Sequence, residues 1–544
     1  MRIVVIGAVA AGTSAAAKAR RNSEDAEIVI YEKDTFISYS GCGMPYYIGG
    51  EVEHGEELTP RDPVFFKNKY NVDIFTAHEV LSFDATNKTL QVKNLNTGLI
   101  FEDHYDKLIL AMGARAVKPP IKGADSKNVF TLRNIEGMYQ IREFIHQNSP
   151  KSAVIIGTGF IGLELCESLK KLTIGVTLLE KLDHVTPGLD PDMAIYVEKH
   201  LQENGVEVIT GANIEEITDN SVLLSDGRKL SSDFVIMATG VRPNTELAKK
   251  AGIELGESGA IQVNQRLETN VKDIYACGDC MEQFHLLTGK PVYRPLGSTA
   301  NKTGRIAGHN ASGGDLAFRG ILGTGIFRMF NLTVSQTGLS EKEARNEGYD
   351  IVVSHNIKPN KPEYMGGKEL VIKSIANRAD GRILGVQIMG EEGVDKRIDV
   401  FAALITCGAK AEDLFHLDLA YAPPFSTTKD PVMYTGMILD NAINHGRPLI
   451  TSEEVLTLIE SGEKINLIDA RISAQYEEKH IEGAMSIPHE RLRVESDGLD
   501  KELLTITYCN KGTTGNAAQN ILMGKGFKKV YNLSGGHKVF AMKK

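Results

Sequence analysis

The residue with the clearest chemical potential is Cys42, which lies in the stretch Ser-Tyr-Ser-Gly-Cys-Gly-Met-Pro-Tyr-Tyr at positions 38–47. Gly41 and Gly43 flank it and let a ligand approach the sulfur closely. Pro45 favours the start of a helix, whose N-terminal dipole would lower the pKa of the thiol. A reactive thiolate would then stand at neutral pH. The alternative is an inert, buried structural cysteine.

Composition narrows the classes of function. The chain has 544 residues, enough for three or four domains, and a formal net charge of -9, so we expect no nucleic-acid partner. Six irregularly spaced cysteines do not form a disulfide framework, and Cys277 and Cys280 lack the second pair of a zinc site, so no metal is expected. The N-terminus resembles no signal peptide and no apolar run reaches membrane-spanning length. We expect a cytoplasmic protein with small-molecule partners and no membrane association.

The first element that could serve Cys42 is a glycine-rich turn near the N-terminus. An apolar run at 2–6 is followed by Gly7 and Gly12, an alanine-rich helical stretch, and a strand at 27–31 that ends in Glu32. This βαβ pattern places a dinucleotide pyrophosphate at the helix N-terminus and the acidic residue near the ribose hydroxyls. Val9 departs from the pattern, because the middle position of the fingerprint is usually glycine. An ordinary packed turn therefore remains the alternative.

A second and complete fingerprint follows at 152–180. A strand at 152–156 leads into a glycine loop that opens a helix, and a strand at 176–179 ends in Glu180. Two such units predict two dinucleotides, for which FAD and a nicotinamide cofactor are the usual pair. Glu180 favours the free 2′-hydroxyl of NADH, although Lys181 keeps NADPH possible. The predicted contacts in this loop are Gly157, Gly159, Phe160 and Gly162.

Strand-to-glycine turns at 109–114 and 235–240 are followed by Thr-Asn-Val-Lys-Asp-Ile-Tyr-Ala-Cys-Gly-Asp at 269–279. With these motifs in this order, residues 1–445 resemble the pyridine nucleotide-disulfide oxidoreductases. The resemblance implies that Asp279 contacts the flavin ribityl chain, and that the FAD-binding domain is split into 1–117 and 245–322 around an NAD(P)H-binding domain at 118–244. It also implies cofactor contacts from Lys33, Val80, Ala111, Gly113, Arg133 and Gly240.

The resemblance implies a dimerisation domain at 323–445, and hence a homodimer. Strand-like runs at 370–375 and 383–389 and a helical stretch at 394–406 precede Asp-Leu-Ala-Tyr-Ala-Pro-Pro-Phe-Ser at 418–426. Residues 450–544 look like a rhodanese domain, with Cys509 opening a loop whose amides stabilise a persulfide or an anion. Thr514 stands where that loop commonly carries arginine, so we expect weak binding of oxyanions such as thiosulfate. The expected fold class is α/β, with two Rossmann-like domains, an α+β dimerisation domain and an α/β rhodanese-like domain.

The single cysteine selects a branch of the family. Tyr47 stands where glutathione-reductase-like members carry a second cysteine, and Ala10 stands where peroxidases and oxidases commonly carry histidine. The chain therefore resembles coenzyme A disulfide or persulfide reductases, which implies that Tyr421 and Tyr364 lie near the reactive sulfur and that Ser38 and Asn301 contact the pantetheine arm. Either tyrosine could instead be interface packing. The candidates for the coenzyme A phosphates are Arg61, Lys67 and Lys69, although lysines at such positions are more often solvated.

The expected reaction is flavin-dependent reduction of coenzyme A persulfide or disulfide by NAD(P)H through Cys42. A persulfide is favoured, because a sulfur-carrying cysteine is useful beside a persulfide reductase. Two alternatives stay open at this point. One is a water-forming NADH oxidase in which Cys42 cycles through a sulfenic acid. The other is a sulfurtransferase with a regulatory flavoprotein portion.

Overall fold

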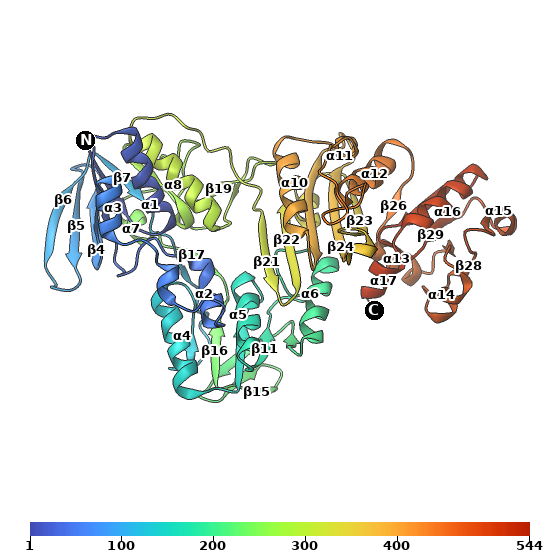
Figure 1. Cartoon of the computed structure of the whole chain (residues 1–544), viewed down its shortest axis with the longest axis horizontal. Coiled ribbons are helices and arrows are strands. Elements are labelled where there is room, and N and C mark those ends of the chain that lie inside the picture. Colours follow the sequence, from blue (N-terminus) through green and yellow to red (C-terminus); the bar gives the residue numbers. More distant parts are fainter. Residues whose placement is uncertain (544) are drawn as a thin grey trace. The chain divides into compact units, whose positions relative to one another are not determined.

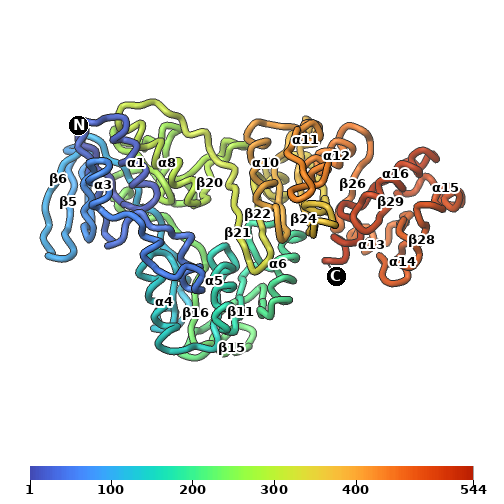
Figure 2. The backbone as a smooth tube through the Cα atoms, viewed as in Figure 1, coloured from blue at the N-terminus to red at the C-terminus, as the bar shows by residue number. Residues whose placement is uncertain are grey.

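A computed structural model describes residues 1–543, and its contacts group the chain into two compact units (Figures 1 and 2). Unit 1 contains Met1–Asp183 and Gly205–Gly323, and unit 2 contains His184–Asn204 and the chain from Thr324 onward. The segment 184–204, which carries α6 (Pro191–Glu203), belongs to unit 2, although its neighbours in sequence on both sides belong to unit 1. Each unit is described separately below.

The first sheet of unit 1 is built from short, continuous apolar runs, as expected for parallel strands covered on both faces. Its order is β18-β7-β1-β2-β3, and β1 pairs in parallel with both β2 and β7. Helices α1 (Ala10–Asn22) and α8 (Gly297–Ala311) pack against each other through small residues. The strands are β1 (Arg2–Ile6), β2 (Glu27–Tyr31), β3 (Asp73–Phe75), β7 (Lys107–Leu110) and β18 (Ile274–Ala276).

The second sheet of unit 1 repeats this βαβ arrangement in the order β12-β11-β10-β16-β9. Strand β10 (Ser152–Ile156) leads into α5 (Phe160–Lys171) and pairs in parallel with β11 (Gly175–Leu179). The remaining strands are β9 (Val129–Phe130), β12 (Glu207–Ile209) and β16 (Phe234–Met237). Unit 1 also contains two three-stranded antiparallel sheets. One consists of β4 (His78–Asp84), β5 (Thr89–Asn94) and β6 (Ile100–His104), and the other of β13 (Ile214–Ile217), β14 (Ser221–Leu224) and β15 (Lys229–Ser231). Each glycine loop therefore lies at the carboxyl end of a central strand, where open α/β sheets bind ligands.

Unit 2 begins with an antiparallel sheet in the order β21-β22-β25-β24-β23. The helix expected at 394–406 is present as α10 (Val394–Thr406), and α12 (Pro431–Asn444) packs against β23. The strands are β21 (Gly325–Met329), β22 (Leu332–Gly338), β23 (Ile351–Pro359), β24 (Glu369–Asn377) and β25 (Ile383–Gly390).

A second, parallel sheet in unit 2 has the order β26-β30-β29-β27-β28. Strand β29 (Leu504–Tyr508) is central, and α16 (Thr513–Gly524) follows it directly. Apolar clusters cover both faces of this sheet, one containing Ile506 and Leu533 and the other Ile468 and Val530. The other strands are β26 (Leu449–Ile450), β27 (Asn466–Asp469), β28 (Met485–Ser486) and β30 (Lys529–Leu533).

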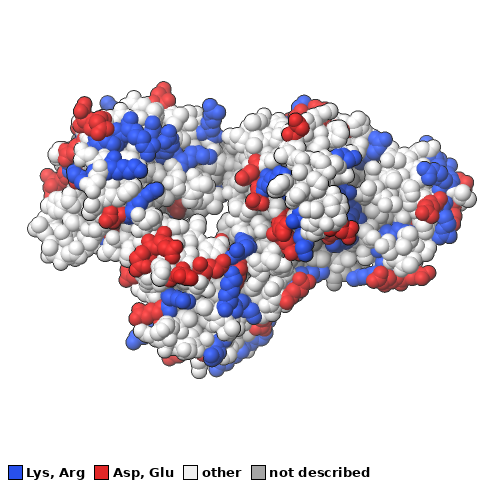
Figure 3. Space-filling model, in the orientation of Figure 1, with Lys and Arg blue, Asp and Glu red and all other residues white. Residues whose placement is uncertain are grey.

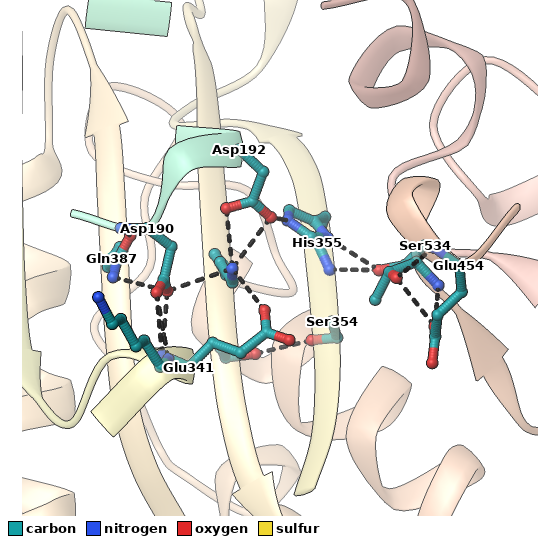
Figure 4. A network of polar contacts seen from close by, with 12 residues as sticks. Asp190, Asp192, Glu341, Ser354, His355, Gln387, Glu454 and Ser534 are labelled. Carbon is teal, nitrogen blue, oxygen red and sulfur yellow. Dashed lines mark hydrogen bonds and ion pairs between the residues drawn. The ribbon is translucent and has the colours of Figure 1, made fainter. Parts of the chain in front are cut away.

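A buried polar network joins the parts of unit 2 (Figure 4). Lys373 on β24 is 1% exposed, and its ammonium lies 2.8 Å from Asp192, 2.8 Å from Glu341 and 3.2 Å from Asp190. Asp192 also contacts Nε2 of His355 at 2.8 Å, and Nδ1 of His355 lies 3.1 Å from the hydroxyl of Ser534. Since buried charges must be paired, this cluster fixes α6 to the antiparallel sheet. Through Ser534 it also reaches the parallel sheet.

No helix within residues 1–543 combines the length and the apolar character that a membrane span requires.

Candidate functional site

The first glycine loop is held from two sides. A Cβ on Gly7, which has φ of +106°, would lie 2.3 Å from the carbonyl oxygen of Ala111, so only glycine fits there. Glu32 accepts hydrogen bonds from the backbone N–H of Ala8 at 2.7 Å and of Asp34 at 2.9 Å. Burial raises the pKa of this carboxyl group, and the two N–H donors oppose that change. Glu32 thus anchors the loop beside which a ribose would bind.

The second loop repeats this arrangement with one informative difference. Glu180 accepts from the N–H of Thr158 at 3.0 Å, from its hydroxyl at 2.6 Å, and from the N–H of Leu182 at 3.1 Å. A Cβ built on Gly159 meets no atom within 4 Å, whereas the corresponding position of the first loop carries Val9. The second loop therefore leaves open space at the helix N-terminus, where a pyrophosphate can approach the backbone closely. This geometry fits a dinucleotide.

Close packing also explains the third glycine of each fingerprint. A Cβ on Gly12 would lie 1.8 Å from the carbonyl oxygen of Gly7, and a Cβ on Gly162 would lie 2.1 Å from that of Gly157. Each helix can therefore approach its loop only with glycine at this place.

Cys42 is exposed and lies in a short 3-10 turn, Gly41–Gly43, directly before α2 (Met44–Ile48). The expectation of a lowered thiol pKa is wrong for this chain. Partial burial raises the pKa of Cys42, the negative charges of Glu164 and Asp279 raise it further, and Arg133 opposes them. A five-residue helix has too small a dipole to offset two carboxylates.

Asp279 and Arg133 come from distant segments and meet as an ion pair beside Cys42. The guanidinium of Arg133 lies 2.8 Å from Asp279 and also donates to the carbonyl oxygen of Ala114 at 2.8 Å. The hydroxyl of Tyr293 donates to the backbone carbonyl of Asp279 at 2.8 Å. Asp279 lies in the turn Gly278–Cys280 after β18. This turn is far from Cys42 in sequence, but it brings the Asp279 carboxylate close to the thiol.

Glu164 is a residue that the motifs did not reveal. It lies on α5, the helix opened by the second fingerprint, and accepts a hydrogen bond from the hydroxyl of Tyr46 at 3.2 Å. Helix α5 packs against α2, which brings this carboxylate close enough to act on Cys42. No sequence signal marks it, because its role depends on the packing of two helices about 120 residues apart in the chain.

Other predicted site residues of unit 1 form hydrogen bonds or apolar contacts within that unit. The N–H of Ser38 donates to the carbonyl oxygen of Ala8 at 2.9 Å, which ties the Cys42 segment to the first loop. Asn301 on α8 accepts from the hydroxyl of Ser14 at 2.7 Å. Val80 on β4 packs against the apolar core, and the carbonyl oxygen of Gly240 accepts from the N–H of Val117 at 2.9 Å.

The charged candidates of unit 1 differ in their partners. Lys33 lies near Glu32, where its charge favours the ionised carboxylate. Lys67 forms an ion pair with Asp73 at 2.8 Å, while Arg61 and Lys69 lie over the ring of Phe65. Gly113, with φ of +64°, faces the guanidinium of Arg133.

In unit 2, Tyr364 and Tyr421 are 76% and 50% exposed. Tyr364 belongs to the turn Glu363–Met365, and Tyr421 precedes Phe425, which is 71% exposed. Large exposed aromatic side chains of this kind are typical of interfaces. The roles assigned to the two tyrosines stay predictions.

The second cysteine site of the sequence, Cys509, directly follows β29 and is buried. Its loop runs to α16 through Gly512, which has φ of +92°. The buried pair of Asp469 and Arg471, at 2.6 Å, supports the loop because Arg471 also donates to the side chain of Asn510 at 3.3 Å. Thr514 is exposed at the loop end. That the amides of this loop stabilise a sulfur anion on Cys509 stays a prediction.

Comparisons with known proteins agree with this geometry. Residues 1–301 match the family "Pyridine nucleotide-disulphide oxidoreductase", residues 326–431 match its dimerisation domain, and residues 451–543 match the rhodanese-like domain. An "NADH oxidase" of Methanocaldococcus jannaschii is 37% identical over 79% of this chain and 97% of its own length. An "NAD(P)H coenzyme A polysulfide/persulfide reductase" of Pyrococcus horikoshii is 33% identical over 80% of this chain and 98% of its own length.

Two solved structures match almost the whole chain, including the rhodanese-like portion. The structure of reduced Bacillus anthracis CoADR-RHD superposes with a TM-score of 0.97 at 36% identity, covering 99% of this chain and 98% of that one. An NAD-dependent persulfide reductase from A. fulgidus superposes with a TM-score of 0.91 at 36% identity, covering 99% and 100%. The predicted fold class is confirmed. With its paired nucleotide loops, its exposed Cys42 and more than half of its length matched, the chain belongs to the pyridine nucleotide-disulphide oxidoreductase family, whose members use FAD and a nicotinamide nucleotide.

Proposed function

We propose that this oxidoreductase uses NAD(P)H and FAD to reduce coenzyme A persulfide or coenzyme A disulfide at Cys42, and that its rhodanese-like domain handles sulfane sulfur. The observation that carries the proposal is the isolation of Cys42. The next cysteine in the chain is Cys166, which is buried in α5. Since Cys42 is free and no other cysteine precedes Cys166 in the sequence, we propose that the second sulfur of a redox disulfide comes from the substrate.

The proposed chemistry balances with a persulfide as acceptor. The thiolate of Cys42 attacks the coenzyme A sulfur, a Cys42–coenzyme A disulfide forms, the sulfur–sulfur bond of the persulfide breaks, and hydrosulfide leaves. The bound cofactors supply the electron pair that reduces this mixed disulfide. Cys42 then regains its thiolate and coenzyme A leaves as a thiol after taking up one proton. Tyr421 is the proposed proton donor, with Tyr364 as the second candidate.

Arg133 and Asp279 contribute to the same step by charge. The raised pKa of Cys42 disfavours the thiolate relative to the neutral thiol. Asp279 and Glu164 disfavour the anion, whereas Arg133 favours it. A change in the ion pair of Arg133 and Asp279 would therefore alter how much thiolate is available.

The charge on unit 1 favours a phosphorylated substrate. Figure 3 shows Lys and Arg side chains gathered on the face where Figure 1 labels α1, α3 (Pro63–Tyr70) and α8. Arg21 lies in the last turn of α1, and Lys67 and Lys69 lie in the last turn of α3. We propose that this face attracts the phosphates of coenzyme A while Ser38 and Asn301 contact its pantetheine arm.

We further propose a homodimer, because residues 326–431 match a dimerisation domain and the aromatic side chains at 364, 421 and 425 are exposed in the single chain. The domain division at 117, 245, 323 and 450 stays a prediction. The six cysteines are all free, which favours a reducing compartment such as the cytoplasm.

The test is an acceptor screen under nitrogen, in which NADH consumption is followed with coenzyme A persulfide, coenzyme A disulfide or no acceptor. Cys42→Ser should abolish turnover with both acceptors while FAD stays bound, because an alcohol cannot form the mixed disulfide. Cys407→Ser is the matched control, since Cys407 is also free and exposed. Turnover above a few per cent of wild type in Cys42→Ser would contradict the mechanism.

A second candidate, NADH oxidase activity, is favoured by the printed name of the 37% identical relative. It predicts that NADH is consumed only when oxygen is admitted, and that neither coenzyme A acceptor supports turnover under nitrogen.

A further inference from the structure

The loop that begins at Cys509 rests on the edge of the antiparallel sheet of unit 2. Glu369, the first residue of β24, forms ion pairs with Lys511 of the loop and with Lys538 of α17 (Gly536–Phe540). The loop's own lysine therefore already has a carboxylate partner. Its positive charge is largely neutralised and is not available to a sulfur anion on Cys509.

A different cation reaches the loop from the neighbouring strand. Lys358 lies on β23, where Pro359 pairs with Glu369 and Lys358 pairs with Leu370 across the β-ladder. Its ammonium donates to the hydroxyl of Thr513, the first residue of α16, at 3.0 Å. It also lies 4.5 Å from the ring centroid of Tyr434. Lys358 is therefore directed at the short segment between Cys509 and α16.

Among residues 1–543, the charge of Lys358 is not paired with a carboxylate. In the part of the chain that the structure describes, its polar contact is a neutral hydroxyl and no ion pair joins it to a carboxylate. Lys429 lies over the same ring at 5.5 Å, which adds a second positive charge. Burial lowers the pKa of Lys358, Lys511 and Lys429 lower it further, and the charge of Cys509 acts in the opposite direction. An unpaired, partly buried cation is costly unless an anion joins it.

We propose that Lys358 is a positioning residue of the rhodanese loop, which stabilises the sulfur anion of Cys509 in place of the arginine that Thr514 replaces. The inference rests on the proposed function only in that Cys509 carries sulfane sulfur. The ligand is a sulfur anion, either the thiolate or the persulfide of Cys509. The sulfur site is then a composite of the rhodanese loop and a strand of the preceding antiparallel sheet.

The transfer step balances in atoms and charge. The Cys509 thiolate attacks the outer sulfur of a low-molecular-weight persulfide, a sulfur–sulfur bond forms at Cys509, and the donor's sulfur–sulfur bond breaks. The donor leaves as a thiolate and takes the proton of the new persulfide. One negative charge therefore stands on the sulfur of Cys509 before and after the transfer, and Lys358 stabilises it in both states.

The test uses the full-length, FAD-loaded protein and measures the alkylation rate of Cys509 by iodoacetamide, resolved by peptide mass spectrometry. At pH 7, Lys358→Gln should slow alkylation about five- to tenfold, because the thiolate loses a nearby cation. Lys358→Arg should stay within about twofold of wild type, since the charge is kept. The difference should shrink at alkaline pH, because Lys358, whose pKa is lowered by burial, loses its charge in the wild type, whereas a merely structural effect would persist there.

Lys361→Gln is the matched control, because Lys361 lies three residues away and its ammonium pairs with Glu392 at 2.9 Å. Sulfur transfer from glutathione persulfide to cyanide should fall in parallel in Lys358→Gln, while NADH-driven reduction of coenzyme A persulfide should not change. A wild-type protein without reductase activity would refute the proposed function and leave the alkylation result valid.

If Lys358→Gln fails to fold, Thr513→Val, which removes the hydroxyl that orients the ammonium, should slow alkylation about twofold. Equal alkylation of Cys509 at pH 7 in wild type and in the folded variant would overturn the inference.

Discussion

Glu180 offers the sharpest test of how the nicotinamide cofactor is chosen. The carboxylate is buried and accepts three hydrogen bonds from Thr158 and Leu182, so its position is fixed beside the second glycine loop. We expect wild-type kcat/KM to be higher for NADH than for NADPH, because a 2′-phosphate would meet this fixed negative charge. Glu180→Gln keeps the shape of the side chain and removes the charge.

The expected change in the preference for NADH over NADPH can be calculated from Coulomb's law. At a separation of about 6 Å, repulsion costs about 0.7 kcal/mol per unit charge in water and about 3 kcal/mol at an effective dielectric of 20. Taking about 1.4 kcal/mol, the ratio of kcat/KM for NADH to that for NADPH should fall about tenfold in the variant. The gain should appear mainly as a lower KM for NADPH.

The amide also has a structural cost, because the glutamine side chain of this variant would place an NH₂ group against one of the N–H donors. Losing one such hydrogen bond costs about 1–3 kcal/mol locally. For this reason KM for NADH should rise severalfold. Stopped-flow reduction of the flavin by each nucleotide measures both effects. A wild-type preference for NADPH, or an unchanged ratio in the variant, would show that Lys181 or another residue governs the choice.

Three further predictions concern other parts of the chain. Cys509→Ser should leave NADH-driven reduction of free coenzyme A persulfide within about twofold of wild type, because Cys42 and the expected nucleotide loops lie in unit 1. Loss of this activity in a folded, FAD-loaded variant would mean that the two cysteines form an obligatory relay. The raised pKa of Cys42 predicts that its alkylation rate increases steadily with pH above 7, because the thiolate fraction increases. A rate that is already constant between pH 7 and 9 would contradict the influence assigned to Glu164 and Asp279. Lys373→Met should lower the free energy of unfolding of unit 2 by about 3–5 kcal/mol, because the buried Asp190 and the partly buried Asp192 and Glu341 lose their cation. Calorimetry should show a much smaller loss in Lys361→Met, and equal losses would mean that burial of Lys373 is unimportant.

Local patterns predicted the elements that carry the nucleotide loops. The runs at 2–6 and 152–156 form central strands because they are apolar on both faces, and the helix at 394–406 has the expected bounds. The fingerprints also located Glu32 and Glu180. These are features within one βαβ unit, in which sequence spacing translates directly into distance.

What the sequence could not predict depends on packing between distant elements. The thiol pKa of Cys42 depends on Glu164 from α5 and on Asp279 from the turn after β18, and neither approaches it along the chain. Lys358 is one of many lysines by composition, and only the docking of the rhodanese loop on β23 distinguishes it. The position of Asp192 could not be predicted either. Its helix, α6, follows the second glycine-loop βαβ unit in sequence, but Asp192 forms an ion pair with Lys373 on β24 of unit 2.

The division of the chain has a mechanical consequence. The backbone passes between the two compact units at three places, after Asp183, after Asn204 and after Gly323. A protease that cuts one of these connections leaves two others intact, so a single nick cannot release either unit. Any hinge movement must likewise be absorbed by three connections at once, which leaves the pair far fewer modes of motion than two domains on a single tether.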